Sequence, residues 1–251
     1  MQSVDINCDM GESFGNFIVG NDKAIFPHIT SCNIACGMHA GDPYHIEKTI
    51  NLALEHKVQI GAHPGYPDIQ GFGRRVLPME PSELSSYIKY QVAALQGMVA
   101  SAGGQLRYVK PHGALYNEIA TNKSVAETVY SAIKSVDPNV KIMGLAGSHV
   151  ETILNQLEMD YVPEAFADRQ YEANGKLRSR SLPNAVIHDA SKAAKQVVSI
   201  VTEHKAFNLD GHEVPLSARS FCIHGDNPAA VKILTTIAEL LEQSNIVKKS
   251  F

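Results

Sequence analysis

The stretch SCNIACGMHAGDP (31–43) passes from an apolar, β-like run through a short polar segment to the start of a helix. The polar segment carries His39 between two glycines, which let the backbone turn sharply and present the imidazole. Asp42 followed by Pro43 has the form of a helix N-cap with proline at the first helical position. This stretch therefore predicts one strand–loop–helix unit with a histidine in its loop.

The same pattern recurs in three further stretches, which carry His63, His112 and His224: QIGAHPGYPD (59–68), RYVKPHGALYN (107–117) and SFCIHGDNP (220–228). In a chain of βα units, the loops that follow parallel strands gather at one edge of the sheet. The four histidines are therefore predicted to share one polar active site.

Strands and helices alternate along the whole chain, which is typical of a parallel α/β fold. Seven apolar runs are predicted strands: 3–7, 29–35, 57–62, 106–111, 140–146, 161–166 and 219–224. Apolar residues at helical spacing lie between them, most clearly over 81–102, where Pro81 suits the first turn and Gly103 the stop. Further helical stripes are centred on 46–54, 125–133, 150–157, 194–201 and 231–241.

Seven strands favour an incomplete seven-stranded (β/α) barrel of the glycoside hydrolase or deacetylase type, with an open doubly wound sheet as the alternative. No Gly- or Pro-rich linker divides the chain, so one domain over 1–251 is predicted. Two insertions interrupt the alternation. The segment 168–183 is polar, and 205–216 carries Asp-Gly between short apolar runs, which predicts a β-hairpin.

Composition narrows the function classes. A net charge of −4 gives no electrostatic reason to expect nucleic acid or an anionic membrane as a partner. The acidic start MQSVDINCDMGES does not resemble a signal peptide, and no apolar run approaches the roughly 18–20 residues of a membrane span. Four cysteines do not form the pattern of a secreted disulfide scaffold. We therefore expect a cytoplasmic protein.

Carboxylates and amides gather near the first strand, in DINCDMGE (5–12). Asp5 and Asn7 share one strand face because side chains alternate with period two, and Asp9 and Glu12 are expected in the following turn. Such a group suits general base catalysis or a hard cation. The alternative is that Asp9 or Glu12 only caps the next helical turn.

Cationic side chains at the other strand ends are candidates for binding anions. Lys110 and His112 alternate and can face the same pocket, and a lysine in an apolar strand end is costly to bury without a partner or an anion. Arg74 and Arg75 follow two glycines, as in a loop that closes over an anion, although exposed surface arginines would look the same.

Two further groups leave alternatives open. Asp168 and Arg169 could form a structural salt bridge or contact substrate, and Asp226 could orient a histidine or cap the last helix. Four histidines and several carboxylates could also hold zinc or manganese, but neither H-E-x-x-H nor C-x-x-C spacing is present. No common phosphate-binding motif occurs. The sequence alone therefore does not decide whether these residues hold a metal ion.

Taken together and in order, DINCDMGE, SCNIACGMHAGDP, GAHPGYPDIQGFGRR, VKPHGALYN, EAFADRQY and CIHGDNP resemble the LamB/YcsF family. The resemblance implies a seven-stranded barrel of the type shared with sugar deacetylases. It also implies the activity of an ATP-dependent 5-oxoprolinase, which cleaves 5-oxo-L-proline to L-glutamate as it hydrolyses ATP, with Mg as the expected counter-ion of ATP. Two partner chains, the B and C subunits of the 5-oxoprolinase, are implied as well. A homo-oligomer is a further expectation.

A lactam carbonyl resists water, and phosphorylation of its oxygen would make that oxygen a leaving group. The candidate catalytic residues are Asp9, His39, His63, Lys110 and His112. The candidate substrate-binding residues are Asn7, Glu12, Asn33, Arg74, Arg75, Asn117, Asp168, Arg169, His224 and Asp226. The competing hypotheses are a stand-alone metal-dependent deacetylase or amidohydrolase, and a non-catalytic binding subunit.

Overall fold

Seven parallel strands close into a barrel in the computed structural model, which describes residues 2–251. They follow one another around the ring as β1 (Ser3–Met10), β2 (Ser31–Ala35), β3 (Gln59–His63), β4 (Leu106–Val109), β5 (Lys141–Leu145), β6 (Tyr161–Phe166) and β9 (Ser220–Ile223). The ring closes because β9 pairs with both β6 and β1. The predicted barrel is thus confirmed, and the open sheet is excluded.

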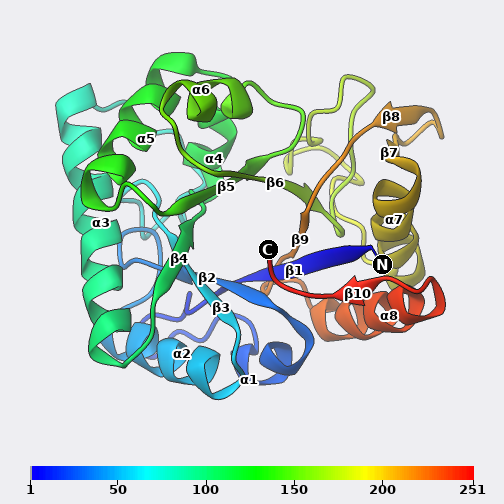
Figure 1. The fold of residues 1–251 in the computed structure, drawn as a ribbon, viewed down its shortest axis with the longest axis horizontal. Helices are drawn as coiled ribbons and strands as arrows, with labels where there is room; N and C mark the ends of the chain where they lie inside the picture. Colours follow the sequence, from blue (N-terminus) through cyan, green and yellow to red (C-terminus); the bar gives the residue numbers. More distant parts are fainter. Residues whose placement is uncertain (1) are drawn as a thin grey trace.

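Helices surround the ring of strands (Figure 1). They are α1 (Asp22–Ile25), α2 (Pro43–Glu55), α3 (Pro81–Ser101), α4 (Gly113–Ile119), α5 (Lys123–Val136), α6 (Val150–Gln156), α7 (Ala190–Glu203) and α8 (Ala230–Gln243), with a 3-10 turn at Phe26–His28. Asp42 caps α2 as predicted, accepting hydrogen bonds from the backbone of Tyr44 and His45. Among residues 2–251, no helix combines the length and apolar character that a membrane crossing needs.

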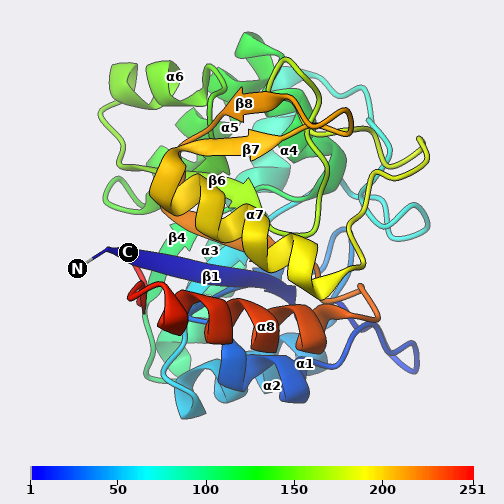
Figure 2. The same cartoon turned by 90° about the vertical axis from the view of Figure 1, so that its right-hand side faces the viewer.

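Three short strands lie outside the barrel ring. The predicted hairpin is present as β7 (Lys205–Phe207) and β8 (Glu213–Pro215), which pair antiparallel. The unpredicted strand β10 (Val247–Lys248) pairs with the start of β1. Figure 2 shows α7 and α8 side by side on one flank, both termini on the left, and the loops that follow the barrel strands on the right.

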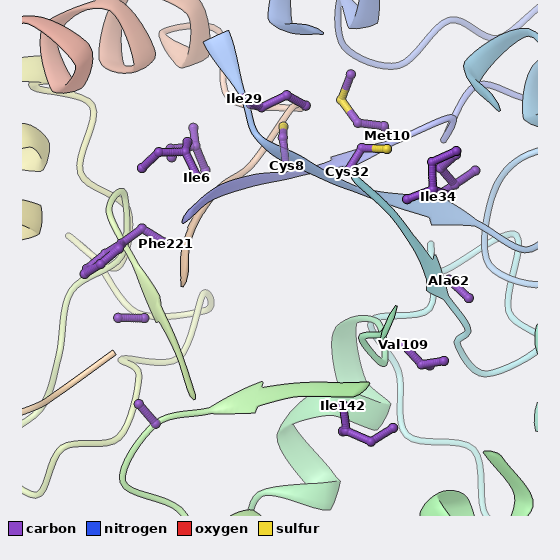
Figure 3. Close-up of a cluster of buried hydrophobic side chains, with 14 of the residues drawn as sticks. Ile6, Cys8, Met10, Ile29, Cys32, Ile34, Ala62, Val109, Ile142 and Phe221 are labelled. Atoms are coloured by element: carbon purple, nitrogen blue, oxygen red, sulfur yellow. The ribbon is translucent and has the colours of Figure 1, made fainter. Parts of the chain in front are cut away.

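The two faces of the barrel strands differ in polarity. Figure 3 shows apolar side chains such as Ile6, Cys8 and Met10 pointing away from the centre of the ring. The alternate residues of β1, namely Asp5, Asn7 and Asp9, form the opposite face. The prediction that Asp9 lies in the turn was wrong, because β1 continues to Met10. All three polar side chains are buried, so β1 contributes a polar face to the barrel interior.

The amino end of the barrel is closed by apolar packing. Tyr108, Met143 and Val162 form a buried cluster against which Phe251, the last residue, packs. In Figure 1 the C-terminus accordingly lies over the centre of the ring. A Cβ at Gly61 would stand only 2.3 Å from the Tyr108 ring, so β3 needs glycine at this position. This apolar packing therefore separates the interior from the amino end of the barrel.

Candidate active site at the carboxyl end of the barrel

A cavity of about 790 Å³ opens at the carboxyl ends of the barrel strands. Part of its wall comes from the polar insertion that follows β6, including Lys176, Ser179 and Arg180. Ten of the predicted site residues line it: Asp9, Glu12, His63, Arg74, Lys110, His112, Asn117, Arg169, His224 and Asp226. The prediction that several strand ends share one polar pocket therefore corresponds to a real cavity.

Lys110 is a buried cation that lines this cavity. Its Nζ lies 2.8 Å from Glu164 Oε1 and 3.1 Å from Asp9 Oδ1, and the residue is only 2% exposed. Burial alone would lower the pKa of Lys110, but attraction to Asp9, then to Cys222 and Glu164, holds it well above its usual value. Lys110 therefore remains an ammonium and supplies a fixed positive charge.

Two asparagines lie beneath the cavity and fix its carboxylates. Asn33 Nδ2 donates to Asp9 Oδ1 at 2.8 Å and to Asn7 Oδ1 at 2.7 Å. Asn7 Nδ2 in turn donates to Glu164 Oε1 at 3.0 Å. Both asparagines are fully buried and do not line the cavity. Their expected role in contacting substrate therefore becomes one of positioning Asp9 and Glu164.

Asp9 is held in its ionised form. Burial would raise the pKa of Asp9, but the charges of His63 and Lys110 bring it well below the usual range. The Asp9 carboxylate, with Oδ1 3.4 Å from His63 Nε2, connects the lysine to the histidines. A carboxylate and an ammonium thus face the cavity side by side.

Three histidines from three loops form a compact cluster. His112 Nδ1 lies 2.9 Å from His63 Nε2, and the His39 ring stacks on the His112 ring at 3.7 Å between centroids. Glu12 Oε1 is 3.4 Å from His39 Nε2 and 3.6 Å from His112 Nδ1. His39 does not line the cavity but packs directly behind His112. We call Glu12, His39, His63 and His112 the histidine cluster.

Charged forms are disfavoured within the histidine cluster. Burial, followed by repulsion from neighbouring histidines, lowers the pKa of His39 and of His112 well below its usual value. Burial and the neighbouring Asp9 raise the pKa of Glu12 well above its usual value. Both histidines are therefore neutral near pH 7.

The fourth histidine, His224, follows β9 and lies near Asp9 and Cys222. His224 Nδ1 is 2.9 Å from Asp168 Oδ1, and the His224 backbone N–H donates to Asp168 Oδ2 at 3.2 Å. Burial would raise the pKa of Asp168, but His224 and further hydrogen bonds lower it. Asp168 thus fixes the orientation of His224 and is itself shielded from the cavity.

Arg169 does not pair with its neighbour Asp168, which removes the salt bridge from the two alternatives that the sequence left open. Its Nη2 donates to the Arg178 carbonyl oxygen at 2.6 Å and its Nε to the Ala185 carbonyl oxygen at 3.3 Å. These bonds tie the polar insertion to the end of β6. Burial, followed by repulsion from Arg180, lowers the pKa of Arg169 to about 10.

The two adjacent arginines are separated by the structure. Arg74 lines the cavity, and its Nη2 lies 2.6 Å from Asp226 Oδ2. Arg180 from the insertion reaches the same carboxylate oxygen at 4.0 Å. Asp226 therefore pairs with arginines rather than orienting a histidine or capping α8, as the sequence had suggested. Arg75 is paired with Asp68 and does not line the cavity, so its predicted role in the site is not supported.

Glu164 is a functional candidate that the sequence pattern did not identify. It is fully buried, binds Lys110 and Asn7, and accepts a 2.7 Å hydrogen bond from Tyr116 OH. Its signal was present, because a glutamate at an alternate position of the apolar run YVPEAF (161–166) is as costly to bury as Lys110. Lys110 and Glu164 therefore compensate each other's buried charge.

The closed ring of seven parallel strands has the fold of a deacetylase-type (β/α) barrel. The fold is similar to that of the polysaccharide deacetylase Bc1974 from Bacillus cereus, with a TM-score of 0.51 over 100% of this chain and 92% of that chain. The sequence identity is 10%, so this likeness shows the fold alone.

The LamB/YcsF family model matches residues 4–251, and the chain belongs to this family. It is 47% identical to the A subunit of the 5-oxoprolinase of Acinetobacter baylyi, over 99% of this chain and 98% of that protein. It is 46% identical to the protein of the same name from Bacillus cytotoxicus, over 94% of each. The crystal structure of a lactam utilization protein from Thermus thermophilus is 39% identical, with a TM-score of 0.94 over 100% of both chains.

Proposed function

We propose that this chain is the A subunit of a multi-subunit 5-oxoprolinase, which opens the lactam ring of 5-oxo-L-proline to give L-glutamate while ATP is hydrolysed to ADP and phosphate. The observation that carries the proposal is the similarity, over nearly the whole chain, to proteins named as the A subunits of 5-oxoprolinases. The composition of the cavity supports it, because a buried ammonium lies beside an ionised carboxylate and two arginines lie at the mouth.

ATP would activate an unreactive amide. Transfer of the γ-phosphoryl group to the lactam oxygen forms a P–O bond and releases ADP. Water then adds to the carbon, and the C–N bond breaks as the nitrogen takes a proton, which leaves an acyl phosphate. A second water molecule cleaves that acyl phosphate to glutamate and phosphate. Each step places negative charge on oxygen atoms that a fixed cation would stabilise.

Different residues of the cavity are suited to stabilising charge, accepting a proton and binding anionic groups in this reaction. Lys110 is placed to stabilise charge on the lactam or phosphoryl oxygens, with Asp9 beside it. His224, fixed through Nδ1 by Asp168, can accept a proton from water on Nε2, as an oriented histidine does in other hydrolases. Arg74 and Arg180 are suited to the substrate carboxylate or to phosphate oxygens.

The proposal is tested on the chain assembled with its partner subunits, with glutamate and ADP measured together. His224→Asn should lower kcat by about 10²- to 10⁴-fold, the contribution of one general base. His212→Asn, which changes an exposed histidine on the β7–β8 hairpin, is the matched control and should leave kcat unchanged. Gel filtration checks that both complexes assemble.

Isotope exchange tests the chemical route. ATP labelled with ¹⁸O in the β–γ bridge should scramble its label during turnover if the γ-phosphoryl group is transferred reversibly to substrate. Absence of both glutamate formation and scrambling in the complete complex would refute the proposal. If His224→Asn and Lys110→Met both preserve turnover and weaken assembly only, the chain has a binding role alone.

A further inference from the structure

His63 and His112 each point one ring nitrogen at the other. When both residues are neutral, neither of these two nitrogens carries a proton. His63 Nδ1 lies 2.7 Å from the Lys110 carbonyl oxygen, and His112 Nε2 lies 2.8 Å from the Phe72 carbonyl oxygen. A carbonyl oxygen can only accept, so each of these ring nitrogens carries the hydrogen. The opposite nitrogens, His63 Nε2 and His112 Nδ1, are then both lone-pair acceptors, and they stand 2.9 Å apart.

Glu12 is a buried carboxylate without a short hydrogen bond on Oε1. The contacts of this oxygen with His39 and His112 are 3.4 and 3.6 Å, longer than the roughly 2.7–2.9 Å of a charge-assisted hydrogen bond. Glu12 is 6% exposed, so bulk solvent does not supply the missing hydrogen bond. An acceptor pair and an under-bonded carboxylate thus surround the same small space.

We propose that the histidine cluster, Glu12, His39, His63 and His112, is a binding site for one first-row transition-metal dication of the zinc class. One ligand atom from each of the four residues lies within 4.8 Å of the other three. Four ligands held about 2.0–2.1 Å from a tetrahedral Zn²⁺ stand about 3.3 Å apart, close to the separations of 2.9, 3.4 and 3.6 Å found here.

The surroundings of two of the histidines match those of metal ligands. A ligating histidine usually donates its second ring N–H to a carbonyl or carboxylate, which fixes the ring and its tautomer. His63 and His112 both do so through the two backbone carbonyls described above. The backbone also packs closely against the His112 ring, because a Cβ at Gly73 would stand only 2.7 Å from His112 Cδ2. The site is therefore held in shape by the fold.

The charge balance favours a dication over a proton. A proton shared by His63 and His112 would satisfy those two nitrogens only, whereas a metal ion would also engage His39 and Glu12. Neutral imidazoles and one carboxylate are ligands that zinc and its neighbours accept readily. Glu12, His63 and His112 also line the cavity, which gives an ion a path to the site.

Metal binding can be measured without substrate, so its outcome is independent of the proposed function. Protein stripped with a chelator should take up one Zn²⁺ per chain by calorimetry and elemental analysis, and Zn²⁺ should raise its melting temperature. Co²⁺ should give the intense visible bands of a four-coordinate ion. His112→Asn and His39→Asn should each weaken Zn²⁺ binding by about 100-fold or more.

His224→Asn is the matched control, since His224 lies at another strand end of the same cavity in a second group with Asp9 and Cys222. This variant should bind Zn²⁺ as tightly as the unaltered protein. Circular dichroism confirms that each variant is folded. The proposal is overturned if stripped protein takes up no stoichiometric metal, which leaves a shared proton as the explanation, or if His224→Asn rather than His112→Asn abolishes uptake.

Discussion

Lys110 and Glu164 form a 2.8 Å ion pair inside the barrel, and neither side chain is more than 3% exposed. Asp9 is a second carboxylate on the same ammonium, so one cation balances two buried anions. Such an arrangement gains little stability over apolar packing, but the loss of one partner leaves a charge buried without compensation. The fold should therefore tolerate few substitutions of Lys110, Glu164 or Asp9.

Replacing Lys110 with Met should be strongly destabilising. Met approximates the length of the lysine but leaves Asp9 and Glu164 facing each other, so the free energy of unfolding should fall by about 3–5 kcal/mol. Urea unfolding followed by circular dichroism measures this loss. Adding Glu164→Gln removes one of the two carboxylates, so the double variant should lose less stability than the sum of the single variants. Additive effects, within about 0.5 kcal/mol, would contradict the ion-pair interpretation.

Two glycine-to-alanine changes should have opposite effects. At Gly61 the new methyl group would overlap the Tyr108 ring, so Gly61→Ala should lower stability by about 1–3 kcal/mol. Gly97 lies within α3, and a Cβ there meets no atom within 4 Å. Gly97→Ala should raise stability by about 0.5–1 kcal/mol because alanine has the higher helix propensity. Thermal melts of the two variants compare them directly, and a tolerated Gly61→Ala would show that the barrel floor is not tightly packed.

The Asp168–His224 pair should make stability depend on pH. The pKa of Asp168 is lowered in the folded state, so its ionised form stabilises the fold above the unfolded value of about 3.9. That contribution should disappear as the pH falls through the lower, folded pKa. The stability difference between the unaltered protein and Asp168→Asn should therefore be largest near neutral pH and shrink below about pH 4. Urea unfolding from about pH 6 to about pH 3 measures it, and a difference that grows in acid would refute the assignment.

Arg74 and Arg75 offer a test within one loop. If Arg74 binds an anionic group of a substrate, Arg74→Ala should lower kcat/KM of the complete complex by roughly 10- to 100-fold, equivalent to about 1.5–3 kcal/mol for a charged hydrogen bond. Arg75 is paired with Asp68 outside the cavity, and its side chain is 60% exposed. Arg75→Ala should therefore leave kcat/KM unchanged. Equal losses in the two variants would show that the loop as a whole, rather than Arg74, matters.

The strand order and the location of the site were accessible from sequence because each barrel unit repeats an apolar run followed by polar residues. The helix α4 was not, since it starts at Gly113 after His112, which makes no side-chain capping bond. The length of β1 was underestimated because its polar face, Asp5, Asn7 and Asp9, resembles a turn when its partners are unknown. Those partners come from distant strands, and only closure of the barrel brings them together.

The sequence could not predict that Arg74 lines the cavity while Arg75 pairs with Asp68. The preceding residues Phe72 and Gly73 have φ of 55° and 63°, a left-handed turn that directs neighbouring side chains differently. The pairing of Asp168 with His224 is equally hidden, because it joins the end of β6 to the end of β9. Local pattern identifies chemically capable residues, while long-range pairing decides which of them meet.

The barrel closes where its first strand, β1, pairs with the last strand of the ring, β9. Asn7, in β1, donates a 2.8 Å hydrogen bond to Ser220, in β9, and β1 pairs with β9 over Asp5–Cys8. During synthesis, β1 therefore leaves the ribosome long before one of its two neighbours exists. Its carboxylates and amides must stay solvated until almost the whole chain has emerged, and such non-local pairing slows folding. The cavity is consequently one of the last parts of the protein to form, and a nascent chain cut short before β9 would lack the part of its wall that follows β9.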